Sequence, residues 1–146
     1  MSAETINYPG DLATPEQICL LAEEYRKAAH KLLELGRPKQ PLSLAPFRLS
    51  AIHAIELYLN VFLMRKGIGS NSIRGMQHNL KARTDLAKEN GLILKSRTLA
   101  HLHALADTRE YLVTRYGPEL CSSVSQINRL VATLEEVATK VASTNK

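Results

Sequence analysis

The sequence predicts an all-α protein, a single-domain bundle of four to five antiparallel helices. Apolar residues recur three and four positions apart in five separate segments, which is the spacing of amphipathic helices. No stretch sustains the two-residue alternation that is typical of strands. A chain of 146 residues with 45% apolar residues is long enough to bury one core. Because the connections are short, neighbouring helices are expected to run antiparallel.

The first predicted helix has a strong start signal in the stretch "TPEQ". Thr14 is expected to cap the helix, Pro15 to be its first residue, and Gln17 to complete a capping box. Apolar residues then follow at helical spacing as far as Leu33, and Gly36 ends the segment.

Four more helices are expected downstream. Their approximate ranges are 45–66, 73–89, 96–114 and 123–141. The second helix should stop at Gly67, and the Gly-rich stretch "GIGSNS" reads as a turn. We expect residues 1–13 to form a flexible arm, residues 14–142 the bundle, and residues 143–146 a frayed tail.

The ends and the cysteines suggest a cytoplasmic protein with no membrane segment. The first twenty residues contain Glu4, Asp11 and Glu16 but no Lys or Arg, the reverse of a secretory signal. No apolar run is expected to reach the length of a bilayer span. Cys19 and Cys121 lie far apart in apolar helical patterns. They are therefore expected to be buried free thiols rather than a disulfide.

Positive charge is concentrated in residues 65–97, while the whole chain has a net charge of +5. That segment contains two acidic residues and eight basic ones: Arg65, Lys66, Arg74, Lys81, Arg83, Lys88, Lys95 and Arg97. Such a concentration attracts anionic partners such as nucleic acids or nucleotides. A solvated helix face explains it equally well, because the segment has no Phe, Tyr or Trp for base stacking.

The stretch "RTLAHLH" opens the fourth predicted helix and contains two histidines. If this helix is regular to its end, one polar stripe contains Arg97, His101, Thr108, Tyr111 and Arg115. We expect this stripe and the segment Thr114–Arg115–Tyr116 to line one groove or a dimer interface. His103 faces another direction on the same helix.

Arg109 breaks the pattern of this helix, because it falls in the middle of the leucine face. A guanidinium there has to be paired or has to reach out of the core. Glu56 lies at the edge of the apolar stripe of the second helix. We therefore expect Glu56 and Arg109 to form a structural ion pair across the helix interface.

Three stretches, taken in order, resemble the HEPN domain, a small helical bundle of the nucleotide-binding type. They are "AIHAIELYLNVFLMRKG", "QHNLKARTDLAKENGL" and "REYLVTRYGPE", and the resemblance covers roughly residues 15–140. Residues that match the family's elements are Glu56, Gly67, His78, Asn79, Leu80, Thr114, Arg115 and Tyr116. Two positions depart from it, with Gly117 where proline is usual and Asn60 where lysine is common. The resemblance implies a bundle of four or five helices that is usually a dimer.

Ribonucleases of this family carry an arginine followed by four to six residues and a histidine, and they cleave RNA at a dimer interface without a metal. Arg97 and His103 fit this spacing, as do Arg48 and His53. In active members a polar residue, often Asn, Asp or His, follows the arginine, whereas Thr98 follows Arg97 and Leu49 follows Arg48. The chemistry is plausible, because imidazole can deprotonate a 2′-hydroxyl and guanidinium can stabilise the phosphate.

Three functions remain open on the sequence alone. The first is a dimeric binding module for nucleotides or RNA that could work with a nucleotidyltransferase partner. No catalysis is expected of such a module. The others are a metal-free ribonuclease toxin using Arg97 and His103, and a non-catalytic dimerisation or adaptor protein. Candidate ligand-binding residues are Arg74, His78, His101, Tyr111, Arg115 and Tyr116, although His78 could instead secure a helix start. No metal or cofactor is expected, because metal-ligand spacings and phosphate loops are not found.

Overall fold

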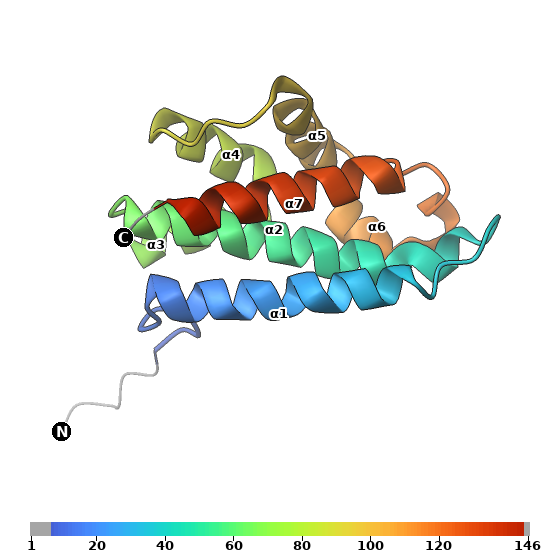
Figure 1. The fold of residues 1–146 in the computed structure, drawn as a ribbon, viewed down its shortest axis with the longest axis horizontal. Coiled ribbons are helices and arrows are strands. Elements are labelled where there is room, and N and C mark those ends of the chain that lie inside the picture. The colour runs from blue at the N-terminus through green and yellow to red at the C-terminus, as the bar shows by residue number, and fades with distance from the viewer. Residues whose placement is uncertain (1–6, 145–146) are drawn as a thin grey trace.

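The computed structural model describes residues 7–144, and these residues are helical apart from turns and loops. They contain seven α-helices: α1 (Pro15–Leu33), α2 (Ala45–Arg65), α3 (Ser70–Gly75), α4 (Leu80–Glu89), α5 (Ser96–Asp107), α6 (Glu110–Tyr116) and α7 (Ile127–Ser143). One 3₁₀ turn precedes α2 and another follows α6. Residues 7–144 contain no strand. Figure 1 shows α1, α2 and α7 side by side along the long axis, with α4 and α5 along one edge. The predicted all-α class is confirmed, whereas the predicted count of four to five helices is not.

The start of α1 follows the local sequence signal. The Gln17 amide N–H donates to Thr14 Oγ1 at 3.1 Å, and the Thr14 amide N–H donates to Gln17 Oε1 at 2.9 Å. Both halves of the predicted capping box are therefore present. These bonds occupy backbone donors that the first turn of a helix otherwise leaves without partners.

Helix α2 lies at the centre of the bundle and contacts α1, α4, α6 and α7. Its largest fully buried side chains are Phe47, Ile55, Tyr58, Leu59, Phe62 and Leu63. A helix covered on several sides has to be apolar all round rather than on one stripe. By length and composition alone, residues 41–65 are long and apolar enough to cross a membrane, but the buried core helix of a globular fold meets the same criterion, and 67% of the apolar 18-residue window in this segment is buried inside the fold.

Two predicted helices are each broken in two. Gln77 has a φ of 50° between α3 and α4, and Arg109 has a φ of 50° between α5 and α6. A left-handed residue other than glycine is costly inside a helix, so the chain changes direction at both positions. Asn79 then caps α4 by accepting a 3.0 Å hydrogen bond from the Ala82 amide. The last helix begins at Ile127, four residues later than predicted.

The described part of the predicted arm, residues 7–13, contacts α3. Arg74 Nη1 donates to Asp11 Oδ1 at 2.7 Å, and the Arg74 guanidinium lies 4.5 Å from the centroid of the Tyr8 ring. Residues 1–6 of that arm lie outside the described residues, as do residues 145–146 of the predicted tail. At the other end of the chain, Arg65 Nη1 donates to the Thr144 carbonyl at 3.0 Å. Both cysteines are free as predicted, but only Cys121 is buried.

A buried ion pair joins α2 to α6. Arg48 Nη1 lies 2.9 Å from Glu110 Oε2, and the two side chains are 8% and 0% exposed. The other carboxylate oxygen of Glu110 accepts hydrogen bonds from the backbone amide and the hydroxyl of Ser125, at 3.1 and 2.9 Å. This pair therefore ties three segments together.

The predicted pair of Glu56 with Arg109 is wrong. Arg109 is exposed and occupies the left-handed turn before α6, whereas Glu56 contacts His78 and Arg83. The prediction assumed one regular helix across this region. The break at Arg109 turns that residue to solvent and turns its neighbour Glu110 into the core.

We predict that Arg48→Met lowers the free energy of unfolding by about 3–5 kcal/mol, because it leaves the Glu110 carboxylate buried without a cation. Adding Glu110→Leu to Arg48→Met should recover part of this loss. The measurement is urea unfolding of the single and double variants, with Lys27→Met, which removes an exposed ion pair, as the control. A loss below about 1 kcal/mol for Arg48→Met would contradict the assignment.

Candidate functional site

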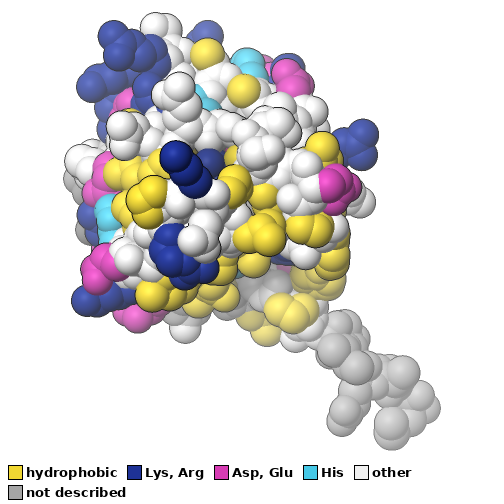
Figure 2. All heavy atoms as spheres, turned by 90° about the vertical axis from the view of Figure 1, so that its right-hand side faces the viewer, with side chains coloured by type: hydrophobic (Ala, Val, Ile, Leu, Met, Phe, Trp, Pro, Cys, Tyr) yellow, Lys and Arg dark blue, Asp and Glu magenta, His cyan; other side chains and the backbone are white. Residues whose placement is uncertain are grey.

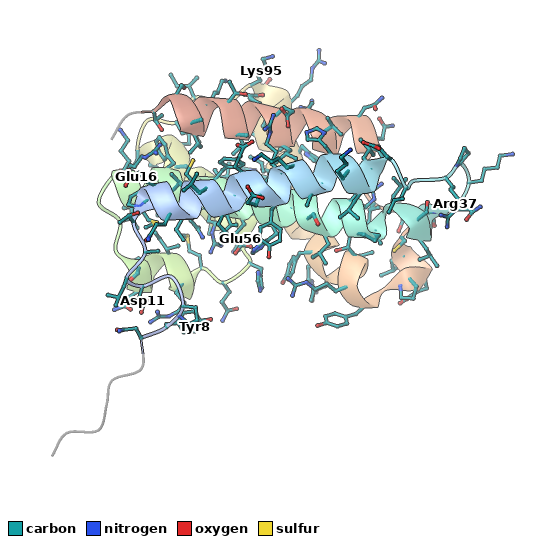
Figure 3. All side chains as sticks on the ribbon, turned by 60° about the horizontal axis from the view of Figure 1, so that its bottom comes forward. Tyr8, Asp11, Glu16, Arg37, Glu56 and Lys95 are labelled. Atoms are coloured by element: carbon teal, nitrogen blue, oxygen red, sulfur yellow. The ribbon has the colours of Figure 1, made fainter. Side chains whose placement is uncertain are left out.

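A cavity of about 1160 Å³ opens at the end of the bundle where α1 begins. It lies between residues 8–18, α2 and the segment from Ile68 to Arg83. Its apolar walls include Ile18, Leu21, Leu57, Met64, Ile68 and Ile73. Figure 3 shows that Glu56, which lines this cavity, lies on the same side of α1 as Asp11 and Tyr8. An apolar cavity with a few polar groups is the usual form of a small-molecule site.

The polar part of the cavity is built from α2 and α4. Glu56 and Asn60 are one turn apart on α2, and the Arg83 side chain approaches both of them from α4. Arg83 Nε donates to Asn60 Oδ1 at 2.7 Å, and Nη2 lies 3.8 Å from Glu56 Oε2. Nη2 also donates to the Ile73 carbonyl at 3.3 Å.

Arg83 is incompletely satisfied in this position. The residue is only 2% exposed, and its Nη1 has no hydrogen-bond partner among the described residues. Burial lowers the pKa of Arg83, and the Glu56 carboxylate opposes that shift. Buried polar groups are nearly always hydrogen-bonded, so this nitrogen is an exception, and it lies beneath the accessible surface of the cavity.

His78 reaches Glu56 from the turn between α3 and α4. Its Nδ1 lies 3.2 Å from Glu56 Oε1, and its ring centroid lies 5.1 Å from that of Tyr111 on α6. The side chain is 44% exposed, so it stands at the mouth of the cavity rather than in the core. The carboxylate orients the imidazole, and within residues 7–144 no hydrogen bond engages its Nε2.

A second histidine, His53, precedes Glu56 by one turn on α2 and also lines the cavity. Its ring packs edge-to-face on Tyr25, with centroids 4.5 Å apart. Burial lowers the pKa of His53. Glu56 raises that pKa, while Arg115 and His78 lower it further. His53 is therefore harder to protonate than an ordinary histidine.

The structure brings together some of the predicted site residues and separates others. Arg74 and His78 line the cavity, Tyr111 packs on His78, and Arg115 is near enough to influence His53. Tyr116 is 75% exposed on the last turn of α6.

The predicted ribonuclease pair does not meet within one chain. His103 Nε2 lies 2.8 Å from Asp85 Oδ1 on α4, whereas Arg97 lines a separate groove shared with α7. The other fit to the motif is also blocked, because Arg48 is buried against Glu110. The single polar stripe is wrong for the same reason as the Arg109 pair: α5 ends at Asp107, before Tyr111.

His101 is a core residue rather than the exposed ligand-binding residue expected from the sequence. It is 6% exposed, and its Nδ1 lies 2.7 Å from Thr133 Oγ1 on α7. Burial lowers the pKa of His101 to about 4, with Arg129 and Arg48 adding to the shift. Its Nε2 has no partner among the described residues.

Arg83 is a site residue that the sequence analysis did not identify. On α4 it shares one face with Leu80, Thr84 and Ala87, all of which are buried. A charged residue on the buried face of a short helix was the available signal. This signal is hard to recognise because Arg83 also lies in the basic segment, whose cations the sequence predicts to form a solvated or anion-binding surface.

Comparison of the chain with models of protein families, with curated proteins and with solved structures finds no significant match. The resemblance to the HEPN domain stays a prediction that rests on its three sequence elements. Within residues 7–144, no group of three or more His, Cys, Asp and Glu side chains is placed to hold a metal ion.

We predict that His101 makes the fold sensitive to acid. Because its pKa is about 4 in the folded chain and ordinarily about 6.5, the unfolded chain binds a proton more readily. The resulting stability is present above pH 6.5 and is lost as the pH falls toward 4. Between pH 7 and 4.5, the parent should lose about 2 kcal/mol more than a His101→Gln variant in urea unfolding. Equal losses in the two proteins would show that His101 is not the responsible group.

Proposed function

We propose that the protein binds a nucleotide, or a single exposed base of an RNA, in the cavity beside α2. The observation that carries this proposal is the combination of apolar walls with a polar floor made by Glu56, Asn60 and the incompletely bonded Arg83. Nucleobases combine flat apolar faces with hydrogen-bonding edges, and proteins recognise them through both features.

The floor has defined hydrogen-bonding roles. The Glu56 carboxylate can only accept, and the Asn60 amide nitrogen, whose partner oxygen accepts from Arg83, has no acceptor of its own within residues 7–144. Arg83 Nη1 also has no partner among residues 7–144, but it is buried, so Asn60 rather than Arg83 Nη1 is the donor to a bound molecule. A bound molecule therefore needs an edge with at least one donor and one acceptor, which every nucleobase carries.

The rim supplies cationic and aromatic groups for the rest of a nucleotide. The Arg74 guanidinium lies over the Tyr8 ring and donates to the Asp11 carboxylate. The His78 ring lies against the Tyr111 ring. A phosphate at the rim would receive hydrogen bonds from Arg74 and from His78 Nε2, and it would compete with Asp11 for the guanidinium. This arrangement supports binding without requiring any catalytic step.

A homodimer and a nucleotidyltransferase partner are further proposals that the HEPN resemblance supplies. The chain exposes several apolar side chains on which a second protein could pack, among them Leu35, Leu42, Tyr116 and Leu120. Figure 2 shows hydrophobic side chains exposed on the face at that end of the molecule, below a corner where Lys and Arg side chains gather.

A ribonuclease is the second candidate, and the Glu56–His78 pair is the observation in its favour. Glu56 contacts Nδ1 of the His78 imidazole and does not contact its Nε2. An imidazole oriented in this way can act as a general base through Nε2. Any RNA cleavage should then depend on His78 and not on Arg97 and His103.

We predict that the parent binds at least one nucleoside monophosphate in calorimetric titration, and that Glu56→Gln weakens this binding about 10-fold or more. A hydrogen bond to a charged group contributes about 1.5–3 kcal/mol, and about 1.4 kcal/mol corresponds to a factor of ten. Glu89→Gln is the matched control, because Glu89 is exposed on α4 and does not line the cavity. The proposal would be abandoned if no nucleotide binds at millimolar concentration, or if the two variants behave alike.

We also predict the outcome of incubating labelled single-stranded RNA with the protein in EDTA. The proposed binding function gives intact RNA with the parent. If the RNA is cut, the ribonuclease candidate gains support when His78→Ala abolishes cutting and the Arg97→Ala/His103→Ala variant does not. Cutting that persists in His78→Ala would exclude the Glu56–His78 pair as its source.

A further inference from the structure

A second concave surface lies between the start of α5 and the outer face of α7. This groove has a volume of about 770 Å³ and is lined by cations from both helices: Lys95, Arg97, Arg129 and Lys140. Ser96 adds a hydroxyl group, and Glu135 and Glu136 are the acidic residues in the lining. Cations from two helices around one groove create a local positive potential that attracts anions.

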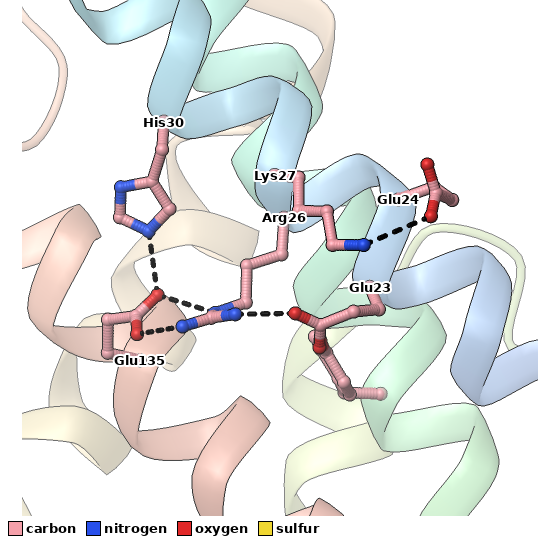
Figure 4. Close-up of polar contacts among 7 residues, drawn as sticks. Glu23, Glu24, Arg26, Lys27, His30 and Glu135 are labelled. Atoms are coloured by element: carbon pink, nitrogen blue, oxygen red, sulfur yellow. Dashed lines mark hydrogen bonds and ion pairs between the residues drawn. The ribbon is translucent and has the colours of Figure 1, made fainter.

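The two carboxylates that line the groove already accept hydrogen bonds from other residues of the protein. Glu135 accepts hydrogen bonds from Arg26 at 2.8 and 2.6 Å and lies 2.8 Å from His30 Nε2, all on α1 (Figure 4). Glu136 accepts from Lys140 Nζ at 2.8 Å, from Thr98 Oγ1 at 2.5 Å and from the Lys95 amide at 2.7 Å. Burial opposes ionisation of Glu136, but these bonds hold its pKa at about 2.

Three cations of the groove consequently have no carboxylate partner within residues 7–144. Neither Lys95 nor Arg97 takes part in an ion pair there, and both side chains are exposed. Arg129 makes one long contact, 3.4 Å from Nη2 to Thr98 Oγ1, and its buried Nε has no partner among the described residues. Because that Nε is buried, an anion in the groove would meet Lys95, Arg97 and the accessible part of the Arg129 guanidinium.

The backbone adds to the positive character of the groove. Among residues 7–144, no side chain caps the start of α5, so the amide N–H groups of its first turn have no side-chain acceptor there. A helix start carries a partial positive charge and favours anions. The Glu136 carboxylate already interacts with this helix start, because it accepts a hydrogen bond from the Lys95 amide.

We propose that the groove between α5 and α7 binds consecutive phosphate groups of an RNA strand. Guanidinium groups pair with phosphate oxygens in bidentate fashion, and Arg97 and Arg129 approach from different helices, which suits more than one phosphate. In Figure 3 Lys95 lies beyond α7, on the opposite side of α1 from Glu56, and the groove and the cavity have no lining residue in common. The proposal rests on the proposed function only in naming RNA as the source of the phosphates.

The same geometry gives Arg97 a different role from the catalytic one that its spacing to His103 suggested. Arg97 faces α7 and the groove, whereas His103 is engaged by Asp85. Arg97 would neutralise a phosphate and position the strand without touching a reacting group.

The test is fluorescence anisotropy with a labelled single-stranded oligoribonucleotide over a range of salt concentrations. In the groove variant Lys95→Gln/Arg97→Gln, two exposed cations are removed. RNA affinity at low salt should fall about 10-fold or more, and the dependence of log affinity on log salt should decrease by about 1.4 for two lost contacts to single-stranded RNA. The matched control is Lys31→Gln/Lys88→Gln, which loses the same charge from exposed positions outside the groove. It should change the affinity less than about 3-fold.

Equal losses in the two double variants would mean that total charge matters rather than the groove, and would overturn the proposal. So would a parent protein that binds no RNA at low salt, or inorganic phosphate that binds while RNA does not. Mononucleotide titrations of the same proteins separate this inference from the proposed function. If mononucleotides bind normally but the groove variant keeps full RNA affinity, only the groove proposal fails. If mononucleotides do not bind and the groove variant still loses RNA affinity, the cavity proposal fails and the groove proposal stands.

Discussion

The burial of α2 is the constraint on which the rest of the structure depends. This helix is surrounded by α1, α4, α6 and α7, so each polar group that it carries has to find a partner on another element. Arg48 is paired with Glu110, Glu56 with His78, and Asn60 with Arg83. The first of these pairs is fully enclosed and structural. The other two lie beside the cavity and leave hydrogen-bonding capacity unused, which is why the candidate site is found there.

Two residues with a left-handed backbone conformation, Gln77 and Arg109, bring these partners to α2. Gln77 breaks the chain between α3 and α4, and the turn presents His78 to Glu56. Arg109 breaks it between α5 and α6, and the following residue, Glu110, enters the core to meet Arg48. A regular helix through either position would point these side chains in other directions. The local cost of a left-handed residue is therefore offset by the pairing of charges on the central helix.

The cavity and the groove use charge in different ways. In the cavity, each positive group stands near a carboxylate: Arg83 near Glu56, and Arg74 near Asp11. Recognition there would depend on shape and on hydrogen-bonding edges. In the groove, the carboxylates are bound by α1, Lys140 and the start of α5, so Lys95, Arg97 and Arg129 have no carboxylate partner within residues 7–144. The basic segment of the sequence is thus divided between several surfaces and does not form a single one.

The features that the sequence determined by itself are those that depend on near neighbours. The all-α class, the capped start of α1 and the extent of α2 follow from local apolar patterns and from one capping box. The tertiary structure alone decided where two helices break and which polar groups meet. Arg48 and Glu110 are 62 residues apart, and Glu56 and His78 are 22 apart. Partners at such separations are chosen by how helices pack, because a buried charge is stable only beside whichever opposite group the packing brings to it.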